Sequence, residues 1–199
     1  MADEWARSTR VRRFAHWFLH YAFTLIWRLE VTGLENLPAE GGVLIAGGPH
    51  TSNMDIIMAV GAGPKRSMRG VTKIEAFKVP FVGWFLRKAD SIPLDRKSSA
   101  GGMRAAIEAL KTGSCVGIFP EGTRSKTGEP GAAKSGTGFL ASRSGAVVVP
   151  VRLVGMRGFP WTRKVGVRFG APMRLDDPRA DSAACQAFSQ AVLERAFSL

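Results

Sequence analysis

The sequence predicts a single α/β domain with a mixed, mostly buried β-sheet of about seven strands, flanked by helices and preceded by an amphipathic helix. Near-continuous apolar runs rich in β-branched residues alternate with helical patterns, which is typical of a sheet covered on both faces. The 199 residues suffice for one core, 45% of them are hydrophobic, and no linker divides the chain. We therefore expect a membrane-associating helix within residues 1–30 and the folded domain at residues 31–199.

The order of the elements follows from the apolar runs and from the residues that interrupt them. Strands are expected at residues 29–34, 43–47, 68–73, 89–94, 114–119, 146–154 and 164–169. Helices are expected at residues 9–28, 53–60, 79–88, 98–112, 138–144 and 182–197. In the helix at 98–112, for example, Ser98 or Ser99 caps the start, apolar residues recur at helical spacing, and Gly113 ends the helix.

A basic and aromatic segment opens the chain and predicts association with a membrane surface. Four arginines between positions 7 and 13 precede an apolar, aromatic-rich run at residues 14–27. A secretory signal is not expected, because the run has no small-residue cleavage site and histidines interrupt it. As a helix the run would rise about 21 Å, short of the roughly 30 Å of hydrocarbon in a bilayer. We expect it to lie in one leaflet at the cytoplasmic face of a membrane. Packing on the protein's own core is the alternative.

The net charge of +12 favours an anionic partner: a membrane surface, nucleic acid, or a negatively charged substrate or carrier. Nucleic acid is not expected as a partner, because the chain has no recognisable reading helix, zinc finger or aromatic RNA-binding motif and its basic residues are dispersed. Cys115 and Cys185 lie in no metal-binding spacing. We expect both to be buried thiols of a protein in a reducing, cytosol-facing compartment.

His50 and Asp55 form the first candidate site. His50 follows the expected strand at 43–47 across a Gly-Pro pair, so it lies at a strand's carboxyl end, where open α/β sheets bind ligands. Ser52 or Asn53 can cap the next helix. We expect His50 in the turn before that helix and Asp55 in its first turn, because within one helix the two would point about 140° apart. A carboxylate on one imidazole nitrogen leaves the other nitrogen to accept a hydroxyl proton. A capping histidine beside a helix-dipole aspartate is the alternative.

The second candidate site is the segment 119–125, Phe-Pro-Glu-Gly-Thr-Arg-Ser, about 70 residues further along. Pro120 ends the strand before it, Gly122 allows a tight turn, and Arg124 offers a planar fork to a phosphate. A solvated turn with a surface ion pair is the alternative.

Together these segments resemble the sequence blocks of the glycerolipid acyltransferase family, the 1-acylglycerol-3-phosphate acyltransferases. The family's first block, Asn-His-x4-Asp, is matched from His50 to Asp55, with Pro49 in place of the asparagine, and its third block is present unaltered at 119–125. The second block, a glycine followed by an Ile-x-x-Asp-Arg-like segment, is matched within 83–96. The fourth, a hydrophobic run into a proline, is matched at 147–151. The chain is short for the family, so its substrate can differ.

The resemblance implies a one-step transfer of an acyl group from acyl-CoA or acyl carrier protein to a lysophospholipid hydroxyl. The expected acceptor is 1-acyl-sn-glycerol-3-phosphate and the expected product phosphatidic acid. His50, oriented by Asp55, would take the acceptor's proton, with no covalent intermediate. The implied acceptor-binding residues come from the second and third blocks and from two nearby lysines: Lys73, Arg96, Glu121, Gly122, Thr123, Arg124 and Lys134. The resemblance implies no metal and no cofactor besides the acyl thioester.

Other patterns carry weaker functional interpretations. The aromatic-rich stretch 77–86 can line an apolar tunnel for the acyl chain, with core packing as the alternative. The segment 128–135 departs from a P-loop by one residue and contains a proline, so nucleotide binding is not expected. His16 and His20 share a helix face but lack a third metal ligand. A catalytically inactive membrane scaffold is the alternative function, and the intact pair of His50 and Asp55 argues against it.

Overall fold

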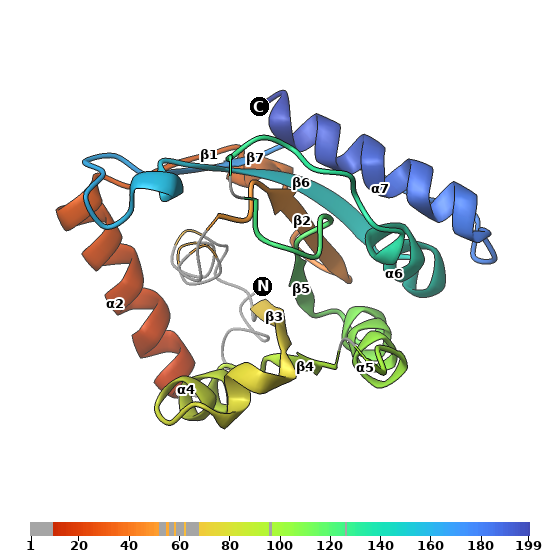
Figure 1. Ribbon diagram of the computed structural model, residues 1–199, viewed down its shortest axis with the longest axis horizontal. Coiled ribbons are helices and arrows are strands. Elements are labelled where there is room, and N and C mark those ends of the chain that lie inside the picture. The colour runs from red at the N-terminus through yellow and green to blue at the C-terminus, as the bar shows by residue number, and fades with distance from the viewer. Residues whose placement is uncertain are drawn as a thin grey trace.

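A seven-stranded mixed sheet forms the centre of the structure (Figure 1). The computed structural model describes residues 10–51, 55, 58, 62, 68–95, 97–125 and 127–199, and for residues 10–13 and 15 it describes the backbone alone. Side by side, the strands are β1 (Glu30–Thr32), β7 (Gly166–Phe169), β6 (Val147–Val154), β2 (Val43–Gly48), β5 (Cys115–Ile118), β3 (Met68–Lys73) and β4 (Ile92–Leu94). The predicted fold class is confirmed, and each expected strand is present.

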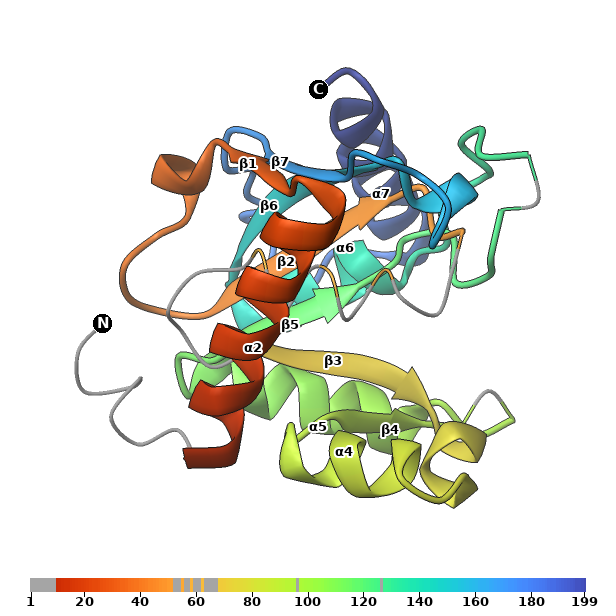
Figure 2. The ribbon, with the colours of Figure 1, turned by 90° about the vertical axis from the view of Figure 1, so that its left-hand side faces the viewer.

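The strand directions bring distant segments of the chain to one edge of the sheet. The neighbouring strands β6, β2, β5, β3 and β4 run parallel, whereas β7 is antiparallel to β6 and pairs in parallel with β1. In Figure 2 the arrows of β2, β5 and β3 point the same way. Since parallel strands end at the same edge, the segments that follow β2, β5 and β3 lie close together.

The α-helices of the described part are α2 (Arg10–Trp27), α4 (Val82–Lys88), α5 (Ala100–Lys111), α6 (Gly136–Ser144) and α7 (Ser182–Phe197). Short 3-10 helices occur at η1 (Leu34–Asn36), η2 (Ile74–Lys78) and η3 (Met156–Gly158).

Two expected helices need comment. The helix expected at 79–88 begins later, as α4 at Val82, because Pro80 lies in the turn that joins η2 to α4. Most of the helix expected at 53–60, with its cap candidates Ser52 and Asn53, lies outside the described residues. Within that range Asp55 and Met58 are helical.

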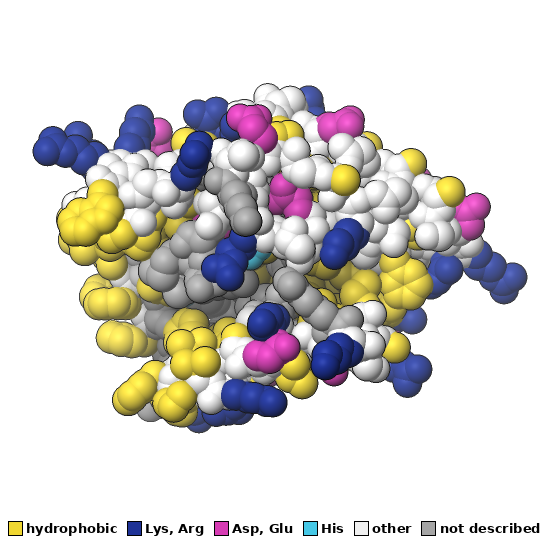
Figure 3. Space-filling view, viewed as in Figure 1, with side chains coloured by type: hydrophobic (Ala, Val, Ile, Leu, Met, Phe, Trp, Pro, Cys, Tyr) yellow, Lys and Arg dark blue, Asp and Glu magenta, His cyan; other side chains and the backbone are white. Residues whose placement is uncertain are grey.

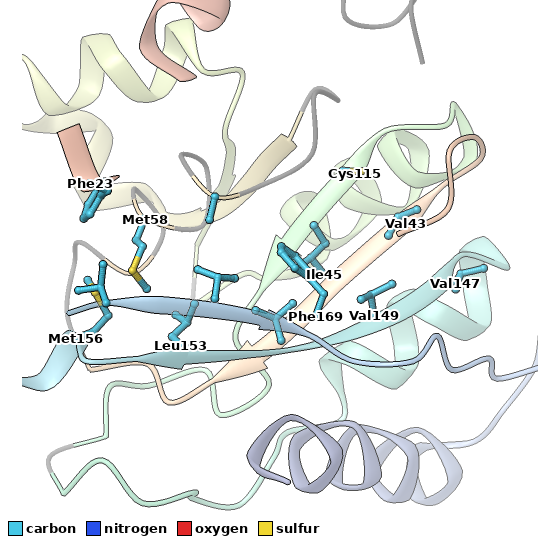
Figure 4. Close-up of a cluster of buried hydrophobic side chains, with 14 residues drawn as sticks. Phe23, Val43, Ile45, Met58, Cys115, Val147, Val149, Leu153, Met156 and Phe169 are labelled. Carbon is cyan, nitrogen blue, oxygen red and sulfur yellow. The ribbon is translucent and has the colours of Figure 1, made fainter. Parts of the chain in front are cut away.

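The hydrophobic core lies on both faces of the sheet. All residues of β2 are buried, and their side chains alternate between two clusters: Val43 and Ile45 join one, Leu44 and Ala46 the other. Figure 4 shows the first cluster, to which α2 contributes Phe23. The helices α5, α6 and α7 contribute buried residues to the second cluster and so cover the opposite face. Each large apolar side chain buried in this way stabilises the folded state by about 1.5–3 kcal/mol relative to an exposed one.

The two cysteines are buried free thiols, as the sequence predicts. Cys115 belongs to the first cluster, and Cys185 lies in α7. Burial raises the pKa of the Cys185 thiol, which keeps it protonated and therefore unreactive.

The helix α2 has an inner and an outer face. Leu19, Phe23 and Trp27 recur every four residues and pack on the core, and the indole Nε1 of Trp27 donates to the Pro160 carbonyl over 2.8 Å. The outer face exposes large apolar side chains: Phe14, Trp17, Phe18, Tyr21, Leu25 and Ile26. Packing on the protein's own core, which the sequence left as the alternative, is therefore observed for the inner face, and membrane association of the outer face stays a prediction. No helix in the described part of the chain is both long and apolar enough to cross a bilayer.

Candidate active site

The candidate site lies at the carboxyl edge of the parallel strands, as predicted. His50 comes two residues after β2, the central strand of the sheet, and the segment 119–125 follows its neighbour β5. Lys73 is the last residue of β3. The strand order β2-β5-β3 therefore brings together residues that are far apart in the sequence.

His50 and Asp55 form a hydrogen-bonded pair. The Nδ1 atom of His50 lies 2.9 Å from Oδ2 of Asp55, and the same carboxylate oxygen accepts the Thr51 backbone N–H over 2.6 Å. As expected, His50 lies in the turn and Asp55 is helical. The Asp55 side chain is fully buried and that of His50 is 17% exposed. Because a carboxylate accepts, Nδ1 is the donor in this pair, and the neutral ring keeps Nε2 as an acceptor.

The segment after β5 holds His50 through three contacts. The ring of Phe119 stacks on the imidazole, with 4.0 Å between the centroids and 12° between the planes. The backbone N–H of His50 donates to Oε2 of Glu121 over 3.3 Å, and its carbonyl accepts the Ser125 N–H over 2.7 Å. Ring and backbone of the histidine are therefore fixed by protein contacts. No sequence pattern indicated this role of Phe119, since aromatic residues at strand ends are common in cores.

Glu121 is buried beneath the site and is only 5% exposed. Its second oxygen, Oε1, accepts the Gly131 N–H over 2.8 Å, so each carboxylate oxygen accepts a backbone N–H. A Cβ atom on Gly48 would lie 3.6 Å from Oε2, which shows how closely the carboxylate approaches the end of β2. In this structure Glu121 joins the backbone at His50 to the loop at Gly131, and an acceptor-binding role for it stays a prediction.

Basic side chains surround the middle of the carboxyl edge, which faces the viewer in Figure 3. Lys73, Arg124 and Lys134 are exposed, as is Thr123. Lys73 forms an exposed ion pair with Glu75 at 3.8 Å, which contributes little to stability. The predicted binding residue Arg96 lies outside the described residues.

Lys134 is directed toward the turn at Gly122. Gly122 has a φ of 64°, and a Cβ atom there would lie 3.2 Å from Cδ and 3.5 Å from Nζ of Lys134. The Lys134 N–H donates to the Pro120 carbonyl over 2.8 Å. One residue earlier, Ala133 forms hydrogen bonds with two amide side chains of α7. Its N–H donates to Oε1 of Gln190 over 3.0 Å, and its carbonyl accepts from Nε2 of Gln186. These glutamines, which sequence reasoning missed, occupy positions i and i+4 of α7, and only the tertiary contact reveals their role.

The stretch 77–86 does not line an enclosed tunnel along its whole length. Phe81 is 88% exposed and Trp84 53%, and Val82 is exposed as well. Leu86 is buried, and Phe77 and Phe85 are partly buried. These three residues therefore do not line an enclosed tunnel: Val82 and Trp84 lie on the outer face of α4, and Phe81 lies in the turn before it.

The described residues contain no cluster of three or more His, Cys, Asp or Glu side chains that could hold a metal ion. The groups at the candidate site that are suited to chemistry are the histidine–aspartate pair and the basic side chains around it. A neutral histidine that carries its proton on Nδ1 can accept a hydroxyl proton at Nε2, and the cations can bind an anionic group of the same molecule.

Comparison with known proteins identifies the family to which the chain belongs. The acyltransferase family model matches residues 28–154. A chloroplastic 1-acyl-sn-glycerol-3-phosphate acyltransferase of Arabidopsis thaliana is 34% identical over 132 residues, which is 65% of this chain and 36% of the relative. The 1-acyl-sn-glycerol-3-phosphate acyltransferase of Bacillus subtilis is 36% identical over 129 residues, 64% of this chain and 63% of the relative. The match thus spans less than two thirds of either relative.

A solved structure resembles the whole fold. The crystal structure of the 1-acyl-sn-glycerophosphate (LPA) acyltransferase from Thermotoga maritima superposes with a TM-score of 0.75 at 28% identity, covering 94% of this chain and 78% of that one. The same family is indicated by the sequence blocks, by the similarity in sequence and by the similarity in fold. The chain belongs to the acyltransferase family and has the fold of its lysophosphatidic acid acyltransferases.

Proposed function

We propose that this protein transfers a fatty acyl group from an acyl thioester to the free hydroxyl of a lysophospholipid, and that 1-acyl-sn-glycerol-3-phosphate is the acceptor and phosphatidic acid the product. The observation that carries the proposal is the 2.9 Å contact between His50 Nδ1 and Asp55 Oδ2 at the carboxyl edge of the sheet. The names of the relatives from Arabidopsis and Bacillus support the choice of acceptor.

In the proposed reaction, Nε2 of His50 takes the proton from the acceptor hydroxyl while the hydroxyl oxygen attacks the thioester carbonyl. The new C–O bond forms, the C–S bond breaks, and the imidazolium returns its proton to the leaving thiolate. Asp55 keeps the ring in the required tautomer and stabilises the imidazolium. General-base catalysis of this kind contributes about 10²- to 10⁴-fold to a rate. The donor is acyl-CoA or acyl carrier protein, and no covalent enzyme intermediate is needed.

The acceptor's phosphate is proposed to bind the basic rim of the site. Lys73, Arg124 and Lys134 supply exposed cations around the carboxyl edge, and Arg96 is proposed to join them. Gly122 and Thr123 form the turn that presents Arg124, and the preceding residue, Glu121, accepts the backbone N–H groups of His50 and Gly131. A guanidinium can bind a phosphate through two parallel hydrogen bonds, which favours Arg124 as the main contact.

A lipid acceptor requires contact with a membrane, and we propose that α2 provides it. The exposed aromatic face of α2 supports binding at the boundary of headgroups and acyl chains, and the net charge of +12 supports attraction to anionic lipids. The protein is proposed to bind the cytoplasmic leaflet peripherally, because the acyl thioester donors are cytosolic.

The reaction is tested by measuring thiol release from acyl-CoA by the purified full chain in detergent, with and without 1-acyl-sn-glycerol-3-phosphate. We expect release that depends on the acceptor and that falls at least 100-fold in His50→Ala, since the base is lost. The melting temperature of the variant shows that it is folded. Undiminished activity in a folded His50→Ala would refute the proposed base.

The same assay separates the remaining alternatives. Release from acyl carrier protein but not from acyl-CoA would assign the donor, and release with another lysophospholipid would reassign the acceptor while keeping the reaction class. If neither donor releases thiol with any lysophospholipid, the reaction proposal fails and the chain is an inactive scaffold of this fold.

A further inference from the structure

A second apolar surface projects from the turn between η2 and α4. Its exposed residues are Val79, Phe81, Val82 and Trp84, which we call the α4 patch. Phe81 is 88% exposed, among the highest values for a large apolar side chain in the described part of the chain. Single exposed apolar residues are common on soluble proteins, but several neighbouring ones that include two aromatics indicate an interaction surface.

The backbone at Phe81 holds its side chain outward. The Val82 N–H donates to the Pro80 carbonyl over 2.5 Å, which closes a three-residue γ-turn with Phe81 at its centre. Phe81 has φ 58° and ψ −52°, a conformation that is unfavourable for a residue with a Cβ atom. A strained turn that exposes an aromatic ring has no benefit to the folded domain alone, and such strain is typical of functional segments.

The inner face of α4 fixes this orientation. A Cβ atom on Gly83 would lie 2.1 Å from the Phe77 carbonyl oxygen, so the helix packs directly on the backbone of η2. Leu86 is buried, and Nη1 of Arg87 donates to the same Phe77 carbonyl over 3.0 Å. The helix cannot rotate to bury Phe81 and Trp84 without breaking these contacts.

Basic side chains flank the α4 patch and identify its partner as an anionic lipid surface. Lys78, Arg87 and Lys88 are exposed beside the apolar residues. The acidic side chains nearby are engaged in ion pairs: Glu75 with Lys73 at 3.8 Å, and Asp90 with Arg69 at 3.0 Å. Apolar and aromatic side chains surrounded by cations suit the boundary where acyl chains meet lipid phosphates.

The α4 patch lies on the same side of the molecule as α2. Hydrophobic side chains gather along that side, at the left of Figure 3, over both helices. Figure 2 faces this side and shows α2 in front of the sheet and α4 at the bottom, below β3 and β4. A protein held by one helix can still turn about the axis of that helix, whereas a second contact away from the axis fixes its orientation.

We propose that the α4 patch inserts into an anionic bilayer as a second anchor besides α2, and so fixes which side of the site a lipid acceptor enters. The inference deepens the proposed function, because it assumes an acceptor that resides in the membrane. The patch is connected to the site along the chain, since η2 begins directly after Lys73 at the end of β3 and leads to Val79.

Site-specific fluorescent labels test the proposal. Cys115 and Cys185 are buried, so a thiol-reactive nitrobenzoxadiazole label attaches selectively to an introduced cysteine. The full chain is labelled in three separate variants: Phe81→Cys in the patch, Phe18→Cys in α2, and Glu108→Cys in α5 as the matched control. Glu108 is exposed and lies on a helix that covers the opposite face of the sheet. Vesicles contain phosphatidylglycerol mixed into phosphatidylcholine.

We expect the labels at 81 and 18 to brighten about threefold or more with vesicles and to be quenched by nitroxide on the acyl chains, with no change at 108. If only the label at 18 responds, α2 anchors the protein alone and the proposal is overturned, while membrane binding stands. If only the label at 81 responds, the patch is confirmed and the role proposed for α2 fails. If neither responds, both proposals fail. An equal response on pure phosphatidylcholine overturns the requirement for anionic lipid.

A partition measurement provides an independent test without a label. We expect Phe81→Ser combined with Trp84→Ser to lower the vesicle partition coefficient about tenfold or more, because two large apolar side chains no longer insert. Leu34→Ser is the control, since it removes an exposed apolar residue from η1 at the opposite end of the sheet. Equal partitioning of the two variants contradicts the proposal. Self-association through the patch without lipid would identify a second copy as the partner and also overturn it.

Discussion

The floor and the rim of the candidate site differ in how their side chains are held. At the floor, formed by His50, Asp55 and Glu121, each carboxylate accepts hydrogen bonds from two groups of the protein, and both carboxylates are buried. At the rim, Lys73, Arg124 and Lys134 are exposed.

We therefore expect the floor residues to act in turnover and the rim residues to act in acceptor binding. The geometry of the floor is fixed before a substrate arrives, so substitutions there should lower turnover and stability together. The rim side chains are solvated until an anion binds, so substitutions there should weaken acceptor binding and leave the fold unchanged. Four substitutions test this distinction, from the largest expected effect to the smallest.

Asp55→Asn should have the largest effect on turnover, a loss of about 10³-fold in kcat. His50 Nδ1 and Thr51 N–H both donate to Oδ2 of Asp55, and an amide oxygen at that position can accept both bonds. The amide lacks the negative charge that stabilises the imidazolium formed when His50 takes the proton. The measurement is steady-state thiol release together with a thermal melt. Asp176→Asn, at an exposed position, is the matched control and should behave as wild type. A variant at position 55 with normal kcat would show that the pair has no catalytic role.

Glu121→Gln should lower both stability and turnover. One of the two backbone N–H groups loses its acceptor, and a buried unsatisfied donor costs about 1–3 kcal/mol. Displacement of His50 should reduce kcat about tenfold. Urea unfolding and kinetics measure the two effects, with Glu108→Gln on the exposed surface of α5 as the control. A higher acceptor KM with unchanged stability would instead assign Glu121 to acceptor binding and place it with the rim.

Arg124→Ala should raise the acceptor KM about tenfold and leave kcat and the melting temperature unchanged, because an exposed guanidinium contributes its binding only when a phosphate is present. Arg124→Lys should recover only part of the affinity, since an ammonium cannot form the planar pair of bonds. Arg163→Ala, an exposed arginine outside the site, controls for the loss of one positive charge. A fall in kcat without a change in KM would contradict the binding role and assign Arg124 a role in turnover, as expected for the floor residues.

Gly122→Ala should have the smallest effect. We expect it to lower the free energy of unfolding by about 1–2 kcal/mol and to raise the acceptor KM a few-fold. The cost in stability arises from the φ of 64°, and the rise in KM from displacement of Lys134, whose Cδ would lie 3.2 Å from the new Cβ. Gly145→Ala is a matched control, because Gly145 has a φ of 68° with no atom near its Cβ position. The control should lose similar stability with unchanged KM, and equal KM values in the two variants would argue against a binding role for Lys134.

The secondary structure was largely predictable because it depends on local pattern. The buried strand β2 shows as an uninterrupted apolar run, and α7 has the predicted bounds because Asp181 caps its start, accepting the Ala184 N–H over 2.8 Å. An exception was the segment before α4: η2 was not expected, and the helix expected from residue 79 begins at Val82, after a turn that contains Pro80.

Most residues of the candidate site could be predicted from the sequence, but the contacts among them could not. The spacing from His50 to Asp55 implied the pair, since a turn followed by a helix allows little other geometry. No local pattern could show that Glu121 accepts the His50 N–H, because that contact depends on β5 lying next to β2. The stacking of Phe119 and the support from Gln186 and Gln190 depend on the same long-range packing.

The sequence by itself determined the order of strands and helices, the histidine–aspartate pair and the family, because each of these depends on residues close together in the chain. The tertiary structure alone decided which of these residues are buried and which remain exposed. Burial depends on what packs against a residue from elsewhere in the chain. For this reason Glu121 became part of the floor, while Phe81 and Trp84, expected to surround an acyl chain, face outward where we propose that a membrane covers them.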